Sequence, residues 1–317
     1  MSANVGRRGF LGALGGLAAV SALPSWADDP AVFPARGNFE RLVLAYQHIH
    51  IGLEKPFSIL HISDTHFTAA YPHEDEKKQK LKEIRTKTFG GRQEEALRDS
   101  LDWAKKNVDY VLHTGDLIDW QSEANFDLVK KYYGSAMFGS LGNHEYSRYM
   151  WLEKSENTNA YKAQTTNLLK EAYPFDIHFH SQIVNGVNFI TLDSVYGYVD
   201  PDQVDLFKAE VKKGLPIVLC MHVPFYTDEI WRADMKFWRP NKKFIGGHIP
   251  DPKGDYLMQK TDPTTRDFIA YLKTEPLLKG ILAGHLHITV QDRFSPTAME
   301  YVVGGNFMFH GQEVLFT

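Results

Sequence analysis

The sequence has very little cysteine, no strong excess of positive charge and no low-complexity tract. Cys220 is the only cysteine in 317 residues, which excludes an internal disulfide and any zinc or iron–sulfur site built from several thiolates. The net charge is −4, so the strongly basic surface typical of nucleic-acid-binding proteins is missing and no nucleic-acid partner is expected. No repeat at solenoid or propeller spacing is present. With 43% hydrophobic residues, the chain is expected to fold around an apolar core.

The first residues differ in composition from the rest of the chain. Arg7 and Arg8 precede a short apolar stretch, and the small residues Ser25 and Ala27 stand at the two positions that a signal peptidase reads. This order is typical of a secretory signal peptide, and the arginine pair resembles the twin-arginine export signal. We therefore predict a twin-arginine-type signal over 1–27 and a mature domain over 28–317.

The same segment predicts where the protein works. We expect an exported bacterial protein, periplasmic or beyond, that contacts the twin-arginine export machinery only transiently. The alternative is a retained membrane anchor. Because about 20 apolar residues are needed to span a bilayer, the run is too short for this, and no stable membrane span is expected after cleavage.

Polar clusters follow five short apolar runs along the rest of the chain. The clusters are Ser63-Asp64-Thr65-His66, Thr114-Gly115-Asp116, Gly142-Asn143-His144-Glu145, His222 and Gly284-His285-Leu286-His287. Helical patterns separate these runs, and strands that alternate with helices indicate an α/β domain. The carboxyl ends of buried strands in such domains are where ligands bind.

Amphipathic patterns place the helices between the clusters. The predicted helices cover residues 92–107, 125–133, 159–172, 201–213 and 264–274. Runs at 187–192 and 299–303 predict further strands without a helix between neighbours, which indicates a second, mixed sheet. Segment 30–55 predicts a strand or hairpin, and the charged stretch 73–87 is interpreted as a solvated helix face or loop.

Taken together, the clusters predict a metal site. One aspartate after a strand is most often a helix cap, and one histidine is most often structural. Eight such residues at one sheet edge would leave unpaired charge without a metal. Imidazole, carboxylate and amide ligands suit manganese, iron or zinc. The glycines before Asp116, Asn143 and His285 predict turns without room for a Cβ.

The five motifs, in this order, resemble the calcineurin-like metallophosphoesterase superfamily over residues 64–287. The resemblance implies a four-layer α/β/β/α sandwich of two mixed sheets flanked by helices. It also implies a centre with two divalent or trivalent metal ions, of manganese, iron or zinc. The implied ligands are Asp64, His66 and His287 for the first ion, Asn143, His222 and His285 for the second, and Asp116 for both.

The resemblance further implies hydrolysis of phosphate esters by a metal-bound hydroxide. His144 is expected to face the scissile phosphate and either stabilise the transition state or protonate the leaving oxygen. Glu145 is expected to orient His144 or a ligand histidine, and Asp119 to support the ligands in a similar way. His61 and His113, inside apolar runs, are interpreted as structural.

Departures from the superfamily's motifs narrow the range of substrates to be expected. Asp119 is followed by Trp120 and Gln121, where protein serine/threonine phosphatases have Arg and Gly, and the tyrosine ligand of purple acid phosphatases is missing. The remaining resemblance is to small single-domain bacterial phosphodiesterase-like enzymes, so a phosphodiesterase is favoured. A phosphomonoesterase, a nucleotide phosphatase and a non-catalytic metal-binding interaction scaffold stay as alternatives.

Segment 224–263 is the candidate for selecting a small phosphate-ester substrate. It combines aromatic faces with cations, which could stack a base or bind a remote phosphate. The candidate residues are Trp231, Arg232, Trp238, Arg239 and His248. The alternative is an ordinary surface loop that packs its aromatic residues on the domain.

Overall fold

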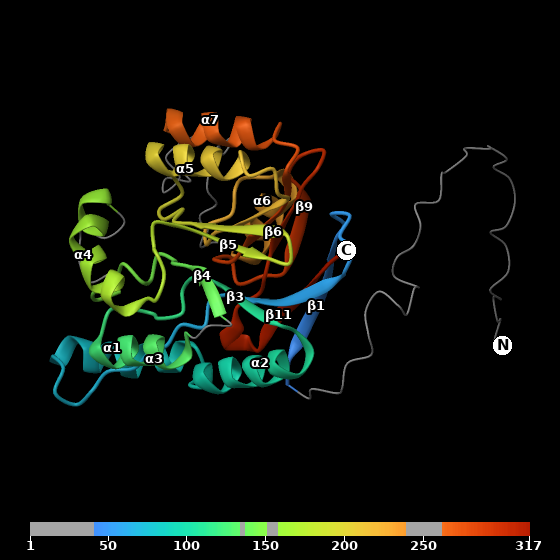
Figure 1. Ribbon diagram of the computed structural model, residues 1–317. Helices are drawn as coiled ribbons and strands as arrows, with labels where there is room; N and C mark the ends of the chain where they lie inside the picture. The colour runs from blue at the N-terminus through green and yellow to red at the C-terminus, as the bar shows by residue number, and fades with distance from the viewer. Residues whose placement is uncertain (1–40, 134–136, 151–157, 239–261) are drawn as a thin grey trace, which may run out of the picture. The chain divides into compact units, whose positions relative to one another are not determined.

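The computed structural model describes residues 41–133, 137–150, 158–238 and 262–317 (Figure 1). The strands are β1 (Val43–Ile49), β2 (Phe57–Ile62), β3 (Tyr110–Thr114), β4 (Met137–Ser140), β5 (Phe179–Val184), β6 (Val187–Leu192), β7 (Ile217–Cys220), β8 (Leu278–Ala283), β9 (Val290–Arg293), β10 (Met299–Val302) and β11 (His310–Phe316). The helices are α1 (Glu76–Thr88), α2 (Gln93–Asn107), α3 (Glu123–Tyr132), α4 (Asn159–Ala172), α5 (Pro201–Val211), α6 (Asp228–Phe237), α7 (Pro263–Leu272) and the short 3₁₀ helix η2 (Asn306–Met308).

The strands form two mixed sheets. The first has the order β1-β11-β2-β3-β4, with β2, β3 and β4 parallel and β11 antiparallel to β2. The second has the order β5-β6-β7-β8-β10-β9, in which β6, β7, β8 and β10 are parallel and both edge strands are antiparallel to their neighbours. The parallel strands of each sheet therefore deliver their carboxyl ends to one edge.

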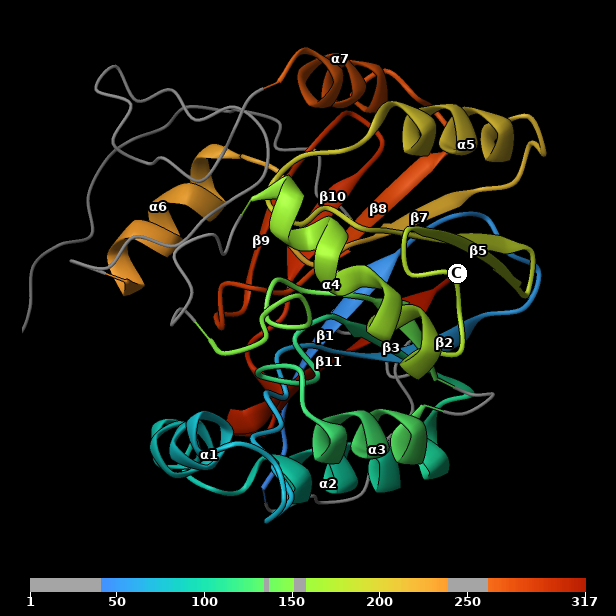
Figure 2. The same ribbon diagram turned by 90° about the vertical axis from the view of Figure 1, so that its left-hand side faces the viewer.

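Three apolar layers hold the sheets and helices together. Between the sheets, Ile59 and Leu112 pack with Phe189 and Val218. Outside the first sheet, residues of α2, α3 and α4 form one cluster with β2 and β3. Outside the second sheet, residues of α5 and α7 pack on β6, β7 and β8. Figure 1 and Figure 2 show the resulting α/β/β/α order, which confirms the predicted fold class.

The observed helices follow the predicted ones closely. The charged stretch 73–87, interpreted from the sequence as a solvated helix face or loop, mostly forms helix α1, on which Leu81 is buried. Helix α6 forms inside the segment that could have been a loop, because Thr227 caps it and Ile230 packs into the protein. Segment 30–55 contributes a single described strand, β1, which pairs with β11 at the far end of the sequence.

His61 and His113 lie inside β2 and β3 and are buried. Burial lowers the pKa of each imidazole to about 3, so both are neutral at physiological pH. His61 Nε2 lies 2.8 Å from Thr114 Oγ1, and His113 Nε2 lies 2.9 Å from Thr65 Oγ1. These contacts tie the strands together directly beneath the polar loops. In the described part of the chain, no helix is long and apolar enough to cross a membrane.

Candidate metal centre

The predicted ligands lie in the loops that follow five strands. Asp64 and His66 follow β2, Asp116 follows β3, and Asn143 follows β4. The second sheet contributes its histidines in the same way, with His222 after β7 and the pair His285 and His287 after β8. Residues more than 200 positions apart therefore meet at one place.

The backbone at this place is unusual for residues with side chains. Five of the ligand positions have a positive φ, between 55° and 71°; they are Asp64, His66, Asp116, His285 and His287. This left-handed region is uncommon for residues other than glycine, and such strain gathers at functional sites. At Gly142, an added Cβ would collide with Asp116 Oδ1, which confirms the predicted lack of room.

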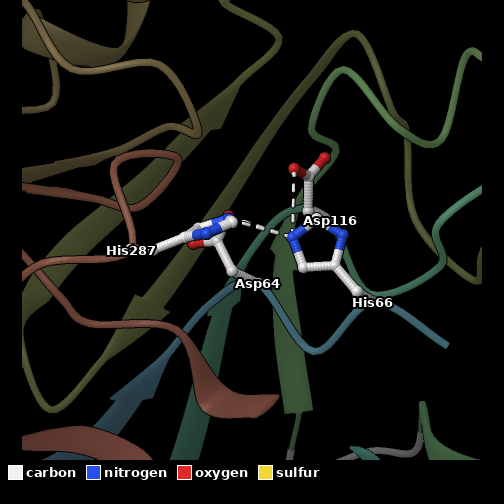
Figure 3. Close-up of side chains that lie close together, drawn as sticks. All are labelled: Asp64, His66, Asp116 and His287. Carbon is white, nitrogen blue, oxygen red and sulfur yellow. Dashed lines mark hydrogen bonds and ion pairs between the residues drawn. The ribbon is translucent and has the colours of Figure 1, made fainter. Parts of the chain in front are cut away.

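Four residues form the first group of ligand atoms (Figure 3). His287 Nε2 lies 3.2 Å from Asp64 Oδ1 and 3.0 Å from His66 Nε2. His66 Nε2 lies 3.8 Å from Asp116 Oδ2. Two imidazole nitrogens and two carboxylate oxygens thus converge on one point.

Asp116 also belongs to a second group, with His222 and His285. His222 Nε2 lies 3.2 Å from Asp116 Oδ2, and His285 Nδ1 lies 3.2 Å from His222 Nε2. The other nitrogen of His222, Nδ1, donates to the Thr114 carbonyl oxygen at 2.7 Å. In the neutral imidazole this bond leaves the lone pair of Nε2 directed to the cluster.

The donor atoms fit cations. Among the residues that the structure describes, Asn143 Oδ1 is buried and accepts no hydrogen bond, and Asp64 Oδ1 accepts none either although it lies near His287. Buried oxygens of this kind are costly without a partner. The ligand atoms are imidazole nitrogens and carboxylate or amide oxygens, a set that suits zinc, iron or manganese.

The electrostatics of the group also favour bound cations. Although burial alone would raise it, the pKa of Asp64 lies well below its usual range because of nearby imidazoles, and that of Asp116 is lowered for the same reason. Burial opposes charge on His66 and His222, yet the neighbouring carboxylates raise the pKa of each to about 9. In the metal-free protein, protons on His66 and His222 therefore supply the positive charge, and bound metal ions would displace these protons.

His144 stands next to the ligands. Its backbone N–H donates to Asp116 Oδ1 at 2.9 Å, and its Nε2 lies 3.8 Å from Asp116 Oδ2. Its Nδ1 lies 2.7 Å from Asp119 Oδ1. The same Asp119 oxygen lies 3.0 Å from His66 Nδ1, so one buried carboxylate contacts both imidazoles.

Comparison with known proteins decides the family. The family model described as calcineurin-like phosphoesterase matches residues 57–289. The chain belongs to the calcineurin-like phosphoesterase family. Hydrolysis of phosphoric ester bonds with metal ions is therefore its activity, and the two ligand groups that share Asp116 correspond to a binuclear centre.

Several solved structures are similar to this calcineurin-like phosphoesterase at low sequence identity. A dimetal phosphatase from Danio rerio is 13% identical with a TM-score of 0.45, and the match covers 80% of this chain and 88% of that one. A purple acid phosphatase from yellow lupin (Lupinus luteus) is 11% identical with a TM-score of 0.47, over 80% and 45% of the chains. A 5′-nucleotidase from Candida albicans is 12% identical with a TM-score of 0.38, over 85% and 47%. No curated protein matches the sequence.

Glu145 differs from the expectation that it orients a histidine. In this calcineurin-like phosphoesterase its carboxylate accepts hydrogen bonds from the backbone N–H groups of Asp116, Leu117 and Gly142, at 2.7 to 2.9 Å. Burial and the nearby Asp116 raise its pKa to about 7. Glu145 therefore fixes the two loops that carry Asp116 and Asn143. Sequence proximity to His144 suggested the wrong partner, because the Glu145 side chain turns back to the loops.

Of the residues predicted to bind substrate, the structure places one beside the metal centre and two elsewhere. Trp238 lies beside the centre: its ring is 5.6 Å from the His287 ring, and its indole N–H donates to the Leu286 carbonyl at 2.8 Å. Trp231 packs with the apolar cluster around Leu286, and exposed Arg232 pairs with acids of its own helix. Arg239 and His248 lie outside the described residues.

Three residues at the calcineurin-like centre had no signal in the sequence. Arg85 contacts Asp119, Phe89 stacks on His66, and Phe307 lies with its ring 5.2 Å from that of His287. Arg85 comes from the charged stretch 73–87, Phe89 lies just after it, and Phe307 comes from a segment near the C-terminus. No local pattern marks such residues, since their importance depends on contacts across the fold.

Proposed function

We propose that this phosphoesterase hydrolyses phosphodiesters, with Asp64, His66 and His287 holding one ion, Asn143, His222 and His285 the other, and Asp116 both. The observation that carries the proposal is the position of His144. It lies against the shared ligand Asp116 and is held by Asp119, next to both ligand groups but outside the proposed ligand sets. When bound, two cations would polarise the phosphoryl group and make water more acidic.

His144 is proposed as the proton donor to the leaving oxygen. Its Nδ1 hydrogen-bonds the Asp119 main-chain carbonyl oxygen at 3.2 Å and lies 2.7 Å from Asp119 Oδ1, so a proton on Nε2 faces the side of Asp116 where the ester would lie. The side chain is nearly fully buried, at 4% exposure, which limits competing proton transfer to bulk water. Asp119 fixes the ring so that this geometry is present before substrate binds.

Two features support a diester over a monoester. A phosphate monoester carries one more negative charge, which enzymes usually neutralise with additional cations. Within the described part of the chain, Arg85 reaches this centre, and it is already paired with Asp119 at 2.6 and 2.8 Å. Trp238 next to His287 offers an aromatic face for the second organic group of a diester.

A substrate panel tests this proposal. Metal-loaded protein is assayed on bis-p-nitrophenyl phosphate, p-nitrophenyl phosphate, cyclic nucleotides and glycerophosphodiesters. We expect a higher kcat/KM for diesters, loss of activity on chelation and recovery with Mn²⁺. A higher kcat/KM for monoesters would contradict the diester preference, and activity that survives thorough chelation would contradict the two-metal centre.

We also propose that the protein is exported through the twin-arginine route. The support is the sequence of residues 1–27, with Arg7 and Arg8 before an apolar stretch and the small residues Ser25 and Ala27 at the cleavage positions. These residues lie outside those that the structure describes. In a bacterial host, the protein should reach the periplasm with its N-terminus at residue 28. Replacing Arg7 and Arg8 by lysine should retain it inside the cell, and unchanged export would contradict the route.

A further inference from the structure

The last turn of α1 reaches the metal centre, although most residues of this helix are exposed. Arg85 donates from Nε to Asp119 Oδ2 at 2.6 Å and from Nη2 to Asp119 Oδ1 at 2.8 Å. The Arg85 side chain is 14% exposed and that of Asp119 is fully buried. This is a two-pronged pair in a buried setting, the geometry in which an arginine fixes a carboxylate most firmly.

The helix makes a second contact with the centre four residues later. The ring of Phe89 stacks on the imidazole of His66, with centroids 4.4 Å apart and planes inclined by 10°. The Arg85 guanidinium lies 4.8 Å from the same phenyl ring. His66 is thus held at its Nδ1 edge by Asp119 and across its face by Phe89.

We infer that Arg85 and Phe89 form a positioning clamp, the α1 clamp, which sets the orientation of both His66 and His144 through Asp119. Asp119 Oδ1 lies within 3.0 Å of nitrogens from Arg85, His66 and His144. A carboxylate held by two imidazoles alone could rotate about its Cβ–Cγ bond. The flat guanidinium fixes the carboxylate plane, and the plane fixes where both imidazoles point.

The clamp differs from the contacts that attach α1 to the protein. Leu81 anchors the helix by packing with Trp120 and Met150, and Lys82 Nζ donates to the Ala70 carbonyl at 3.0 Å. These contacts do not involve the centre. Arg85 therefore has a specific effect on the ligand and the proton donor that is separable from helix attachment.

The inference rests on phosphoester hydrolysis at this centre but not on the preference for diesters. Supporting partners of metal ligands typically contribute 10- to 100-fold to metal affinity or activity. For Arg85→Ala, we expect kcat to fall about 10- to 100-fold with a much smaller change in KM, because the ligand and the donor are misplaced while the substrate pocket is intact. The Mn²⁺ concentration for half-maximal binding, measured by titration of the metal-free protein, should rise by a similar factor.

Rescue separates positioning from general stability. Arg85→Lys should recover part of kcat, because an ammonium replaces one of the two contacts. Low millimolar guanidinium, far below denaturing concentration, should restore part of the turnover of Arg85→Ala by occupying the vacated space. The control is Lys87→Ala in the same helical turn, which removes a 76% exposed cation that pairs with exposed Glu83 and should match the wild type.

Phe89→Leu tests the other part of the clamp. It keeps an apolar side chain but removes the flat ring that stacks on His66, so we expect a few-fold weaker Mn²⁺ binding with little change in melting temperature. The clamp is overturned if Arg85→Ala matches Lys87→Ala in both turnover and metal binding. It is also overturned if activity falls only together with a lower melting temperature and neither lysine nor guanidinium rescues it. If the wild type hydrolysed no ester, the hydrolytic function would fail, whereas the metal titrations would still decide the clamp.

Discussion

The metal centre has two halves: the first contains Asp64, His66 and His287, the second contains His222 and His285, and both share Asp116. The imidazoles of the two halves are oriented by different means. In the first half, His66 is oriented by side chains from distant segments, the Asp119 carboxylate at 3.0 Å and the Phe89 ring at 4.4 Å. In the second half, His222 is oriented by a backbone carbonyl, that of Thr114, at 2.7 Å. A backbone acceptor at the end of a strand is fixed by the sheet itself. Single substitutions of side chains can therefore change the orientation of His66 in the first half. The orientation of His222 in the second half depends on the backbone of the sheet.

The largest effect is expected where the halves meet. Asp116→Asn removes the shared negative charge from both ligand groups at once. We expect loss of at least about 10³-fold in kcat/KM and retention of fewer than two metal ions per chain, because the metals contribute several kcal/mol to the transition state. Steady-state kinetics and elemental analysis measure the two results. Two tightly bound ions in this variant would show that Asp116 does not join the halves.

A large effect on turnover alone is expected for His144. His144→Ala should lower kcat about 10²- to 10⁴-fold while about two metal ions per chain remain, since the residue is proposed to transfer a proton rather than to bind metal. His73→Ala, at an exposed histidine paired with Glu123, is the control. Loss of metal from His144→Ala would mean that it is a ligand.

An intermediate effect should separate the halves. Asp119→Asn removes the carboxylate that contacts His66 and His144 and leaves the His222 bond to Thr114 unchanged. We expect about 10- to 100-fold lower activity, with weaker binding of one ion and unchanged binding of the other, as seen in a metal titration. Asp127→Asn, which contacts exposed Tyr71, serves as the control. Equally weakened binding of both ions would contradict the claim that Asp119 supports only the first half.

The smallest effect concerns stability and pH in the metal-free protein. Because the pKa values of His66 and His222 are raised from 6.5 to about 9, their stabilising contribution is full below pH 6.5 and is lost as the pH rises through 9. Glu300, whose burial raises its pKa to about 8, acts in the same direction. We expect a loss on the order of 1 kcal/mol per histidine, because the same carboxylates serve several imidazoles.

Melting temperatures with chelator at pH 6.5 and pH 9 test this prediction. The metal-loaded protein should show a smaller pH dependence, because metal holds the imidazoles neutral at both pH values. Asp119→Asn should reduce the pH dependence of the melting temperature of the metal-free protein by about the contribution of His66. The contribution of His222 should remain. A metal-free protein that is more stable at pH 9 would contradict the raised pKa values.

The sequence predicts site residues that a local pattern marks, and it misses residues whose role depends on contacts between distant segments. The residues that follow β2, β3, β4, β7 and β8 were found because each lies directly after an apolar run, and parallel strands bring their ends together. Glu145 was placed in the right region but with the wrong partners, because the donors to its carboxylate are backbone N–H groups that no sequence pattern marks. Arg85 was missed, since its partner Asp119 is 34 residues away.

The position of β11 has a consequence for the order of folding. This strand lies between β1 and β2, and Ser58 bonds Glu313 across 255 residues of sequence. Just before it, the backbone N–H groups of Asn306 and Phe307 donate to the carbonyls of Ser63 and Asp64. Contacts of such long range form slowly. The loop that carries Asp64 and His66 therefore completes its hydrogen bonds only when Asn306 and Phe307 have reached it, however early its own strand is synthesised.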